Sequence, residues 1–303
     1  MGSRSSAFSH LLQPALHEIF FEKYGMRPKE YQSIFSIENT TRAYEQDTEI
    51  TGLGPLVQKQ EGRAITYDDP VQGEIKTYTP VPYALGFRVT HELYSDDQYG
   101  IIKRMPSALS RSAHQTEEVN TWSVLNNAFS TAQLGLDRQP LCSLAHPNVA
   151  AGPGSGPYSN RLATDADLSI TSLQSMLELM ETTTDDRDMP ILLRPKLLVI
   201  PYSLKWMAKE LLESEHKPHT ADNEINALKG EGLSYMVAHY LTSTSAWFLL
   251  TDKEEHYLRF FWREALSFDN DDDFDTGDAK FKAYMRFTCG FSGWRGIAGT
   301  PGA

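Results

Sequence analysis

A strictly alternating apolar segment closes the sequence. Between Phe281 and Phe291, in FKAYMRFTCGF, every second residue is apolar, and the residues between them are mostly charged or polar. This period of two predicts a β-strand with one buried and one wet face. At about 3.3 Å per residue the strand spans roughly 40 Å, about twice the usual length. We therefore expect a long sheet whose core includes the C-terminal part of the chain. The apolar side of the strand consists of Phe281, Ala283, Met285, Phe287, Cys289 and Phe291.

The composition excludes several classes of protein. The chain has 303 residues, with 40 acidic and 28 basic side chains and a formal charge of −12. A sequence-specific reader of nucleic acid normally carries a basic patch, which this balance argues against. An acidic wall can still surround nucleic acid without adhering to it. The two cysteines, Cys142 and Cys289, make a disulfide framework improbable and fit a reducing compartment. No apolar run approaches the roughly 20 residues of a membrane span.

A long polar hairpin is predicted between residues 51 and 83. Strand-like pieces at 55–67 and 74–79 flank DDPVQG, whose Asp, Pro and Gly are turn residues. An isolated two-stranded hairpin is marginal in water because nothing covers its apolar side chains. The hairpin therefore needs a partner, which is either its own domain or another copy of the chain. Its scattered apolar residues are Val57, Ile65, Tyr67, Val71, Ile75 and Tyr78.

The rest of the chain predicts an α+β fold. The N-terminal arm begins with a short amphipathic helix over 11–24, and a long helix is expected over 106–135. From about 165 to 252 helices and strands alternate, and this module is inserted into a second one built from chain on both sides of it. The long helix has only a thin apolar stripe, formed by Leu109, Ala113, Val119, Trp122, Asn126 and Phe129.

The acidic turn at 269–278 fails as a calcium loop. Asp271, Asp273 and Asp275 alternate as in an EF-hand, but Thr276 stands where glycine is needed and Lys282 where a bidentate glutamate belongs. A solvated turn is the better interpretation.

The other candidate sites are equally weak. His216 and His219 lie in a polar loop, 216–232, and are more typical of solvated side chains than of metal ligands. Cys142 and His146 lack an identifiable third group that would orient a base, so a buried small cysteine is expected. We predict no catalytic residue, no metal site and no cofactor, and hence a protein that is not an enzyme.

The order of these elements resembles the major capsid proteins of tailed bacteriophages, with the Hong-Kong-97-type fold. Three stretches carry the likeness: YALGFRVTHELYSDDQYG at 83–100, LNNAFST at 125–131, and FDTGD followed by KFKAYMRFTCGFSGWRGIAG up to residue 299. Locally the chain is most similar to the Mu-type major head subunit. The resemblance implies an N-terminal arm (1–45), an extended loop hairpin (46–90), a peripheral domain with a spine helix (91–164), an axial domain (165–255) and a return to the peripheral domain (256–303).

The resemblance also implies a function. Copies of the chain would assemble as hexamers and pentamers into an icosahedral head that encloses double-stranded DNA, with a portal protein and scaffolding or decoration proteins as further partners. The protein would belong to the virion and be assembled in the host cytoplasm, without a membrane. Two alternatives remain: an encapsulin-like compartment shell, and a soluble α+β enzyme with its site at loop 216–232.

The hairpin and the N-terminal arm are both expected to bury their apolar residues on neighbouring copies of the chain. Trp294 and Arg295 either pin the end of the closing strand or contact an adjoining subunit. Lys59 and Lys76 lie where some relatives crosslink, but no acceptor asparagine or catalytic glutamate can be identified, so no crosslink is predicted. The candidate contact residues are Val57, Ile65, Tyr67, Asp68, Asp69, Ile75, Tyr78, Trp294 and Arg295.

Overall fold

The closing strand lies inside the longest sheet of the protein. The computed structural model describes residues 8–90, 93, 100–150, 157–216, 225–273 and 278–303. In this sheet, of order β1-β8-β9-β4, strand β9 (Ala279–Phe291) pairs antiparallel with β8 (Leu258–Asp272) and β4 (Val81–Val89). Strand β1 (Ser36–Asn39) joins β8 in parallel at the edge. Five of the six alternating apolar residues are buried and Cys289 is partly buried, so the predicted strand is confirmed.

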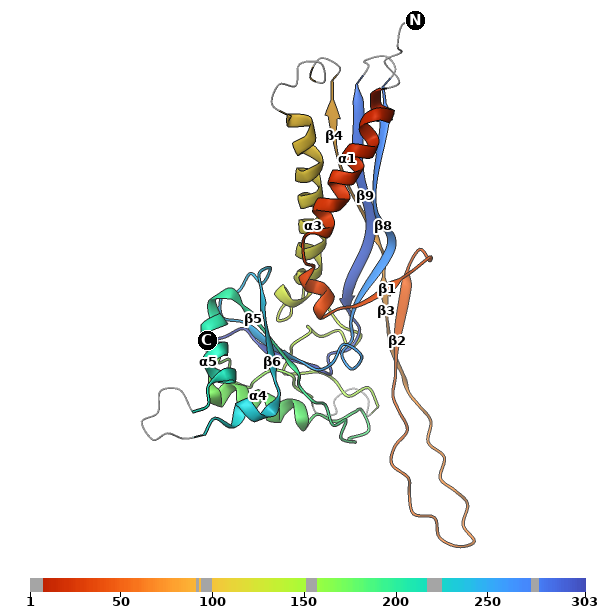
Figure 1. Cartoon of the computed structure of the whole chain (residues 1–303). Coiled ribbons are helices and arrows are strands. Elements are labelled where there is room, and N and C mark those ends of the chain that lie inside the picture. The colour runs from red at the N-terminus through yellow and green to blue at the C-terminus, as the bar shows by residue number, and fades with distance from the viewer. Residues whose placement is uncertain (1–7, 91–92, 94–99, 151–156, 217–224, 274–277) are drawn as a thin grey trace, which may run out of the picture.

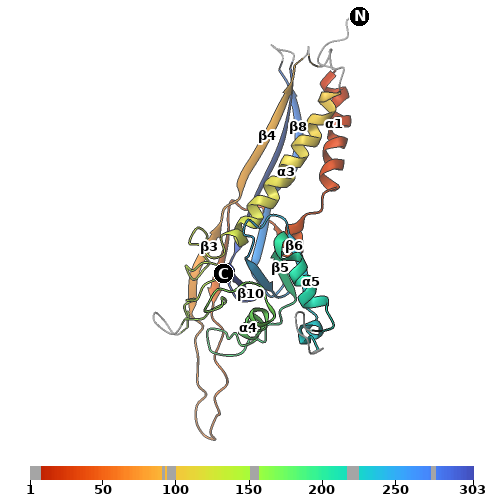
Figure 2. The same cartoon turned by 90° about the vertical axis from the view of Figure 1, so that its left-hand side faces the viewer.

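Two helices cover one face of this sheet, as Figures 1 and 2 show. They are α1 (Phe8–Gly25) and α3 (Ile101–Asn126). Leu16 and Phe20 of α1 are buried, and the Phe20 ring stacks on Phe268 of β8 at 4.8 Å. The arm was expected to leave its apolar residues for neighbouring copies, and for this helix the expectation was wrong. The reason is that the long sheet extends far enough to cover them within the same chain.

The spine helix α3 differs from its prediction at both ends. It begins at Ile101, before Pro106, and ends at Asn126 instead of 135. At the last residue of α3, the Asn126 side chain contacts the segment after β6: its Nδ2 donates to the Tyr240 carbonyl at 3.0 Å and its Oδ1 accepts from Thr242 N at 2.9 Å. Val119, expected in the buried stripe, is 48% exposed. The buried face instead contains polar side chains, namely Ser110, His114, Glu117, Glu118 and Thr121.

A second sheet, of order β10-β7-β5-β6, forms the body below the first. Its strands are β5 (Leu197–Pro201), β6 (Ser234–Ala238), β7 (Trp247–Leu250) and β10 (Ile297–Thr300). The prediction that 256–303 returns as one piece to the first module was wrong for β10. This strand pairs with β7, and its Ile297 and Ala298 are buried in the apolar core there.

Helices α4 (Ile170–Glu181) and α5 (Lys205–Glu213) pack on the second sheet. The predicted Ser169 cap is confirmed, because its hydroxyl accepts from Ser172 N. Three short 3-10 turns complete the secondary structure of the described residues: η2 (Glu30–Ser33), η3 (Tyr202–Leu204) and η4 (Ala227–Glu231).

The two sheets share one apolar core. Trp122 of α3 lies in the same buried cluster as Phe248 of β7 and Phe287 of β9. The inserted module is therefore packed against the first one through side chains of both.

The hairpin is built differently from its prediction. Its paired strands are β2 (Glu45–Ile50) and β3 (Gln72–Tyr78), which form a separate two-stranded ribbon. The strand expected at 55–67 was wrong. Residues 51–71 pair with no strand among the described residues and run as a long loop that projects beyond the body in Figures 1 and 2. Without a neighbouring ladder, the backbone groups of this segment have no reason to adopt regular strand geometry.

Candidate assembly surface

The projecting loop presents large apolar side chains to water. Tyr67 is 83% exposed and Val57 is 70% exposed, and almost all of the remaining residues from 52 to 71 are exposed as well. Folded monomers rarely expose a continuous set of such side chains unless it serves an interaction. This loop is consequently the strongest candidate surface for association. The exposed apolar residues of the loop and its ribbon are Ile50, Leu53, Leu56, Val57, Ile65, Tyr67, Val71 and Ile75.

Seven of the nine residues predicted for self-assembly lie on the loop or its ribbon, and six of them are exposed there. Val57, Ile65 and Tyr67 are in the loop, and Ile75 is half exposed on β3. Asp68 and Asp69 are at the base of the loop, where it rejoins the ribbon. Their role in contacts with a neighbouring copy stays a prediction.

Tyr78 does not fit that role. Its ring packs near Phe261, and its hydroxyl lies 2.7 Å from Ser292 Oγ in the interior, where burial raises its pKa. It therefore anchors the ribbon to its own chain instead of meeting a neighbour.

Trp294 and Arg295 also face inward. Trp294 is buried and stacks on His146 at 4.4 Å. Arg295 donates to the Thr184 carbonyl at 3.1 Å and to Asp186 at 2.9 Å, while its guanidinium lies 4.6 Å from the Trp294 ring. Of the two roles considered for this pair, pinning the end of the closing strand is the one observed. Their role in contacts with a neighbouring copy stays a prediction.

Lys76 holds the ribbon against the body. Its ammonium donates to the carbonyls of Leu134 at 2.8 Å and Phe291 at 2.6 Å, and lies 4.1 Å from the Phe291 ring. Removal from water lowers the pKa of Lys76 to about 8, because the charged form loses hydration that the carbonyls replace only in part. Lys76 thus fixes where the ribbon leaves the protein.

Sequence reasoning missed three of the exposed apolar residues, namely Ile50, Leu53 and Leu56. Ile50 and Leu53 come before the strand that was predicted at 55–67, and Leu56 lies at its start, in the segment TGLGPL. Two leucines beside glycines and a proline were the available signal, since such a segment cannot hide them in a helix or a central strand.

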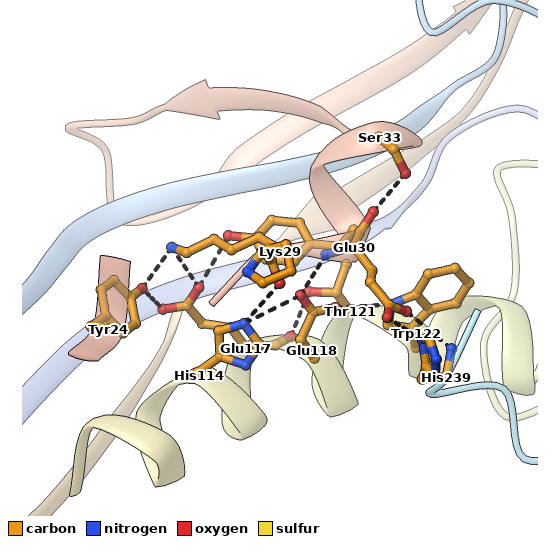
Figure 3. A network of polar contacts seen from close by, with 12 residues as sticks. Tyr24, Lys29, Glu30, Ser33, His114, Glu117, Glu118, Thr121, Trp122 and His239 are labelled. Atoms are coloured by element: carbon orange, nitrogen blue, oxygen red, sulfur yellow. Dashed lines mark hydrogen bonds and ion pairs between the residues drawn. The ribbon is translucent and has the colours of Figure 1, made fainter. Parts of the chain in front are cut away.

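A second feature missed from the sequence is a buried polar network that joins α3 to the end of α1 and the residues after it (Figure 3). Glu117 forms an ion pair with Lys29 at 2.9 Å and accepts hydrogen bonds from the hydroxyls of Tyr24 and Tyr31. Both tyrosines have a raised pKa, because of burial first and the nearby Glu117 charge second. The network joins the arm to the spine helix.

Glu118, the adjacent carboxylate, reaches a different set of partners. It accepts from Glu30 N at 2.8 Å and from Trp122 Nε1 at 2.9 Å. Glu30 in turn accepts from His239 N at 3.0 Å, which extends the network to the residue that follows β6. Burial raises the pKa of Glu118 to about 7. These contacts explain the thin apolar stripe, since α3 uses much of its buried face for carboxylates.

No group of three or more metal-ligating side chains is found within the described residues. Cys142 is buried and its thiol pKa is raised by that burial, while His146 forms hydrogen bonds with Asp137 and Asn160. His219, Asp275 and Thr276 lie outside the described residues.

Within the part of the chain that is described, no helix has the length and apolar character needed to cross a membrane.

Comparison with known proteins identifies the family. A sequence profile described as phage capsid protein matches residues 73–299, more than two thirds of the chain. The chain belongs to the phage capsid protein family. It is thus a structural major capsid protein of a phage head. A comparison with curated protein sequences gave no match.

Solved structures share the fold of this capsid protein at low sequence identity. The capsid of cyanophage P-SCSP1u matches with a TM-score of 0.61 and 9% identity, covering 91% of this chain and 89% of that one. The capsid of bacteriophage JBD30, decorated with minor capsid protein trimers, matches with a TM-score of 0.56 and 16% identity, over 71% and 92% of the two chains. A virus-like particle from Pyrococcus furiosus matches with a TM-score of 0.51 and 8% identity, over 94% and 97%. As a member of the phage capsid protein family, the protein is a virion component.

Proposed function

We propose that copies of this capsid protein build a closed icosahedral shell in which loop 51–71 of each copy lies across a neighbouring copy. The observation that carries the proposal is the exposure of Leu53, Leu56 and Tyr67 on a segment that pairs with no strand in the described part of the chain. Burying such side chains contributes about 2 kcal/mol each. Repeated around every copy, this gives the large apolar interface of an obligate assembly, above about 2,000 Å².

The proposal includes the contents and surroundings of the shell. Hexamers and pentamers form its surface, double-stranded DNA fills it, and a portal protein occupies one opening. Scaffolding or decoration proteins act during or after assembly in the host cytoplasm. The formal charge of −12 supports loose contact with packaged DNA, because phosphates are repelled and not gripped. The proposal assigns no catalytic role to the chain.

Replacement of residues 52–70 by a short Gly-Ser linker tests the role of the loop. The variant should fold with an unchanged thermal unfolding temperature, because almost none of these side chains is buried. It should form no shells in negative-stain micrographs and elute as a small species in size-exclusion chromatography. Tyr78 and Lys76 are kept, since they anchor the ribbon.

Point substitutions separate apolar contact from loop length. Leu56→Ser combined with Tyr67→Ser should raise the protein concentration needed for assembly by about a hundredfold, since each of the two lost apolar contacts costs about 1.4 kcal/mol or more. The matched control is Lys59→Ser combined with Glu61→Ser in the same loop, which should assemble normally. Normal shells from the linker variant would refute the reach-across role of the loop.

A compartment shell with a protein cargo is the second candidate. The likeness in fold to the virus-like particle from Pyrococcus furiosus is the observation that keeps it in view. The contents of particles purified from their natural source distinguish the two: double-stranded DNA supports the phage head, and an enclosed protein supports the compartment.

A further inference from the structure

The guanidinium of one arginine contacts both sides of the loop at the point where the loop leaves the body. Arg187 Nε donates to the Gly52 carbonyl at 3.1 Å, and Arg187 Nη2 donates to the Asp69 carbonyl at 2.9 Å. Arg187 Nη2 also lies 3.5 Å from Asp68 Oδ1, and the Arg187 side chain is only 19% exposed. We call these contacts of Arg187 with Gly52 and Asp69 the root clamp.

The root clamp follows directly after the last hydrogen-bonded pair of the ribbon. Thr51 N donates to the Val71 carbonyl at 2.9 Å, and Val71 N donates to Thr51 Oγ1 at 2.9 Å. Beyond this pair, Gly54 N donates to Asp68 Oδ2 at 2.8 Å, and at the loop tip Arg63 N donates to the Gln60 carbonyl at 3.3 Å. A loop held by so few contacts pivots at its root unless another group fixes it.

Arg187 is itself held by a rigid turn of the second module. Asp185 Oδ1 accepts from the backbone N–H of Arg187 at 2.8 Å and of Met189 at 2.9 Å. Asp188 has a positive φ of 60°, and its carboxylate accepts from the Tyr158 hydroxyl at 2.7 Å. The turn therefore presents the guanidinium from a fixed position.

Open space lies beside the root of the loop. A cavity of about 710 Å³ lies between the start of the loop and the body, and carboxylates, two arginines and several apolar side chains line it. Its walls include Asp47, Glu49, Gly52, Asp137, Asp186 and Trp294. With open space on this side, the direction of the loop depends on polar contacts. A planar guanidinium with two donors on two carbonyls fixes direction as well as distance.

We propose that Arg187 is a positioning residue for assembly: the root clamp sets the direction in which loop 52–70 projects toward the neighbouring copy. This inference rests on the proposed function of the loop. The contacts join the inserted module to the loop, so the placement of that module also determines where the loop tip reaches.

Spin labels on the unassembled protein test the root clamp without reference to assembly. One label replaces Gln58 in the loop and the other replaces Lys209 on α5, and pulsed electron spin resonance measures the distribution of distances between them. Arg187→Ala should broaden the distribution, because losing two charge-assisted hydrogen bonds shifts the balance between clamped and unclamped roots by about tenfold or more. Arg187→Lys should behave like alanine, since one ammonium cannot bridge both carbonyls in the same geometry.

The matched control is Arg138→Ala, which removes an arginine that pairs with Glu74 of the same ribbon at 2.6 Å but does not touch the loop. It should leave the distribution unchanged. Equal widths for the unchanged protein, Arg187→Ala and Arg138→Ala would overturn the proposal.

Assembly provides the second measurement. With an intact clamp, shells should be uniform in diameter, whereas Arg187→Ala should give fewer and irregular particles. If the linker variant of the loop still forms shells, the proposed function fails while the spin-label result stands on its own. If Arg187→Ala broadens the distances but forms uniform shells in full yield, the positioning role fails and the loop function stands.

Discussion

At the scale of single residues, two adjacent carboxylates on α3 have different environments. Glu117 is matched by the Lys29 ammonium at 2.9 Å. Glu118 receives two neutral N–H donors, and His114 Nε2 is 3.9 Å away. A buried carboxylate without a close cation favours its protonated form, which is why the pKa of Glu118 rises to about 7.

The raised pKa predicts a pH-dependent contribution of Glu118 to stability. The folded chain binds this proton more tightly than the unfolded chain, whose carboxyl has the ordinary pKa of 4.5. The contribution is therefore fully present below pH 4.5 and is lost as the pH rises through about 7. Glu118→Gln lacks this titration, and the contributions of all other titrating groups to stability cancel when the two proteins are compared. The free energy of unfolding of the unchanged protein relative to the variant should fall by about 2 kcal/mol between about pH 5 and about pH 8.

Denaturant unfolding at several pH values measures this difference. A difference that is constant across the range, or that grows with pH, would contradict the burial-driven shift of Glu118.

At the scale of elements, the pairing of β4 with β9 depends on a close approach of two backbones. Gly86 lies opposite Lys282 in the ladder, and a Cβ at Gly86 would be 2.5 Å from the Phe281 carbonyl oxygen. Backbone atoms cannot yield as a flexible side chain can. The absence of a side chain at Gly86 is thus a condition for this register.

Gly86→Ala should accordingly destabilise the protein by about 2 kcal/mol or more, with loss of pairing between β4 and β9. Thermal unfolding measures the loss, and hydrogen exchange of the β4 amides locates it. Gly25→Ala is the matched control, because a Cβ there meets nothing within 4 Å. Similar unfolding temperatures for the two variants would show that β4 moves aside without cost.

At the scale of the whole molecule, the chain crosses between its two sheets more than once. It enters the second sheet at β5, returns to the first at β8 and β9, and enters the second again at β10 (Figure 1). Ile297 and Ala298 are buried there, and Gly299 N donates to the Asn160 carbonyl at 3.1 Å. The two modules are therefore tied together in sequence and in core packing.

Removal of residues 297–303 should destabilise the entire protein and not only its end. It leaves the edge of β7 unpaired and opens the core under α4, so we expect a large fall in the thermal unfolding temperature and poor solubility. Removal of residues 302–303 alone is the control and should have little effect. A soluble 1–296 chain with normal unfolding would mean that β10 adds little to the second sheet.

Several features of the fold follow from local patterns in the sequence. The alternation from Phe281 to Phe291 determines a strand with one buried face, and the residues of α4 and α5 determine amphipathic helices. The exposed loop was also foreseeable in part, because Val57, Ile65 and Tyr67 are too few and too scattered to cover one another. Periodicity and turn chemistry act between neighbours in the chain, so they can be read without a structure.

The packing partners of these elements, in contrast, depend on the tertiary structure. The length of β8 and β9 determines that Leu16 and Phe20 pack on the sheet of their own chain. The fold around Tyr78, Trp294 and Arg295 determines that these side chains face inward. Arg187 contacts Gly52 across 135 positions of sequence, and Lys29 reaches Glu117 from outside α3. Such contacts depend on distance in space, which no local pattern of residues encodes.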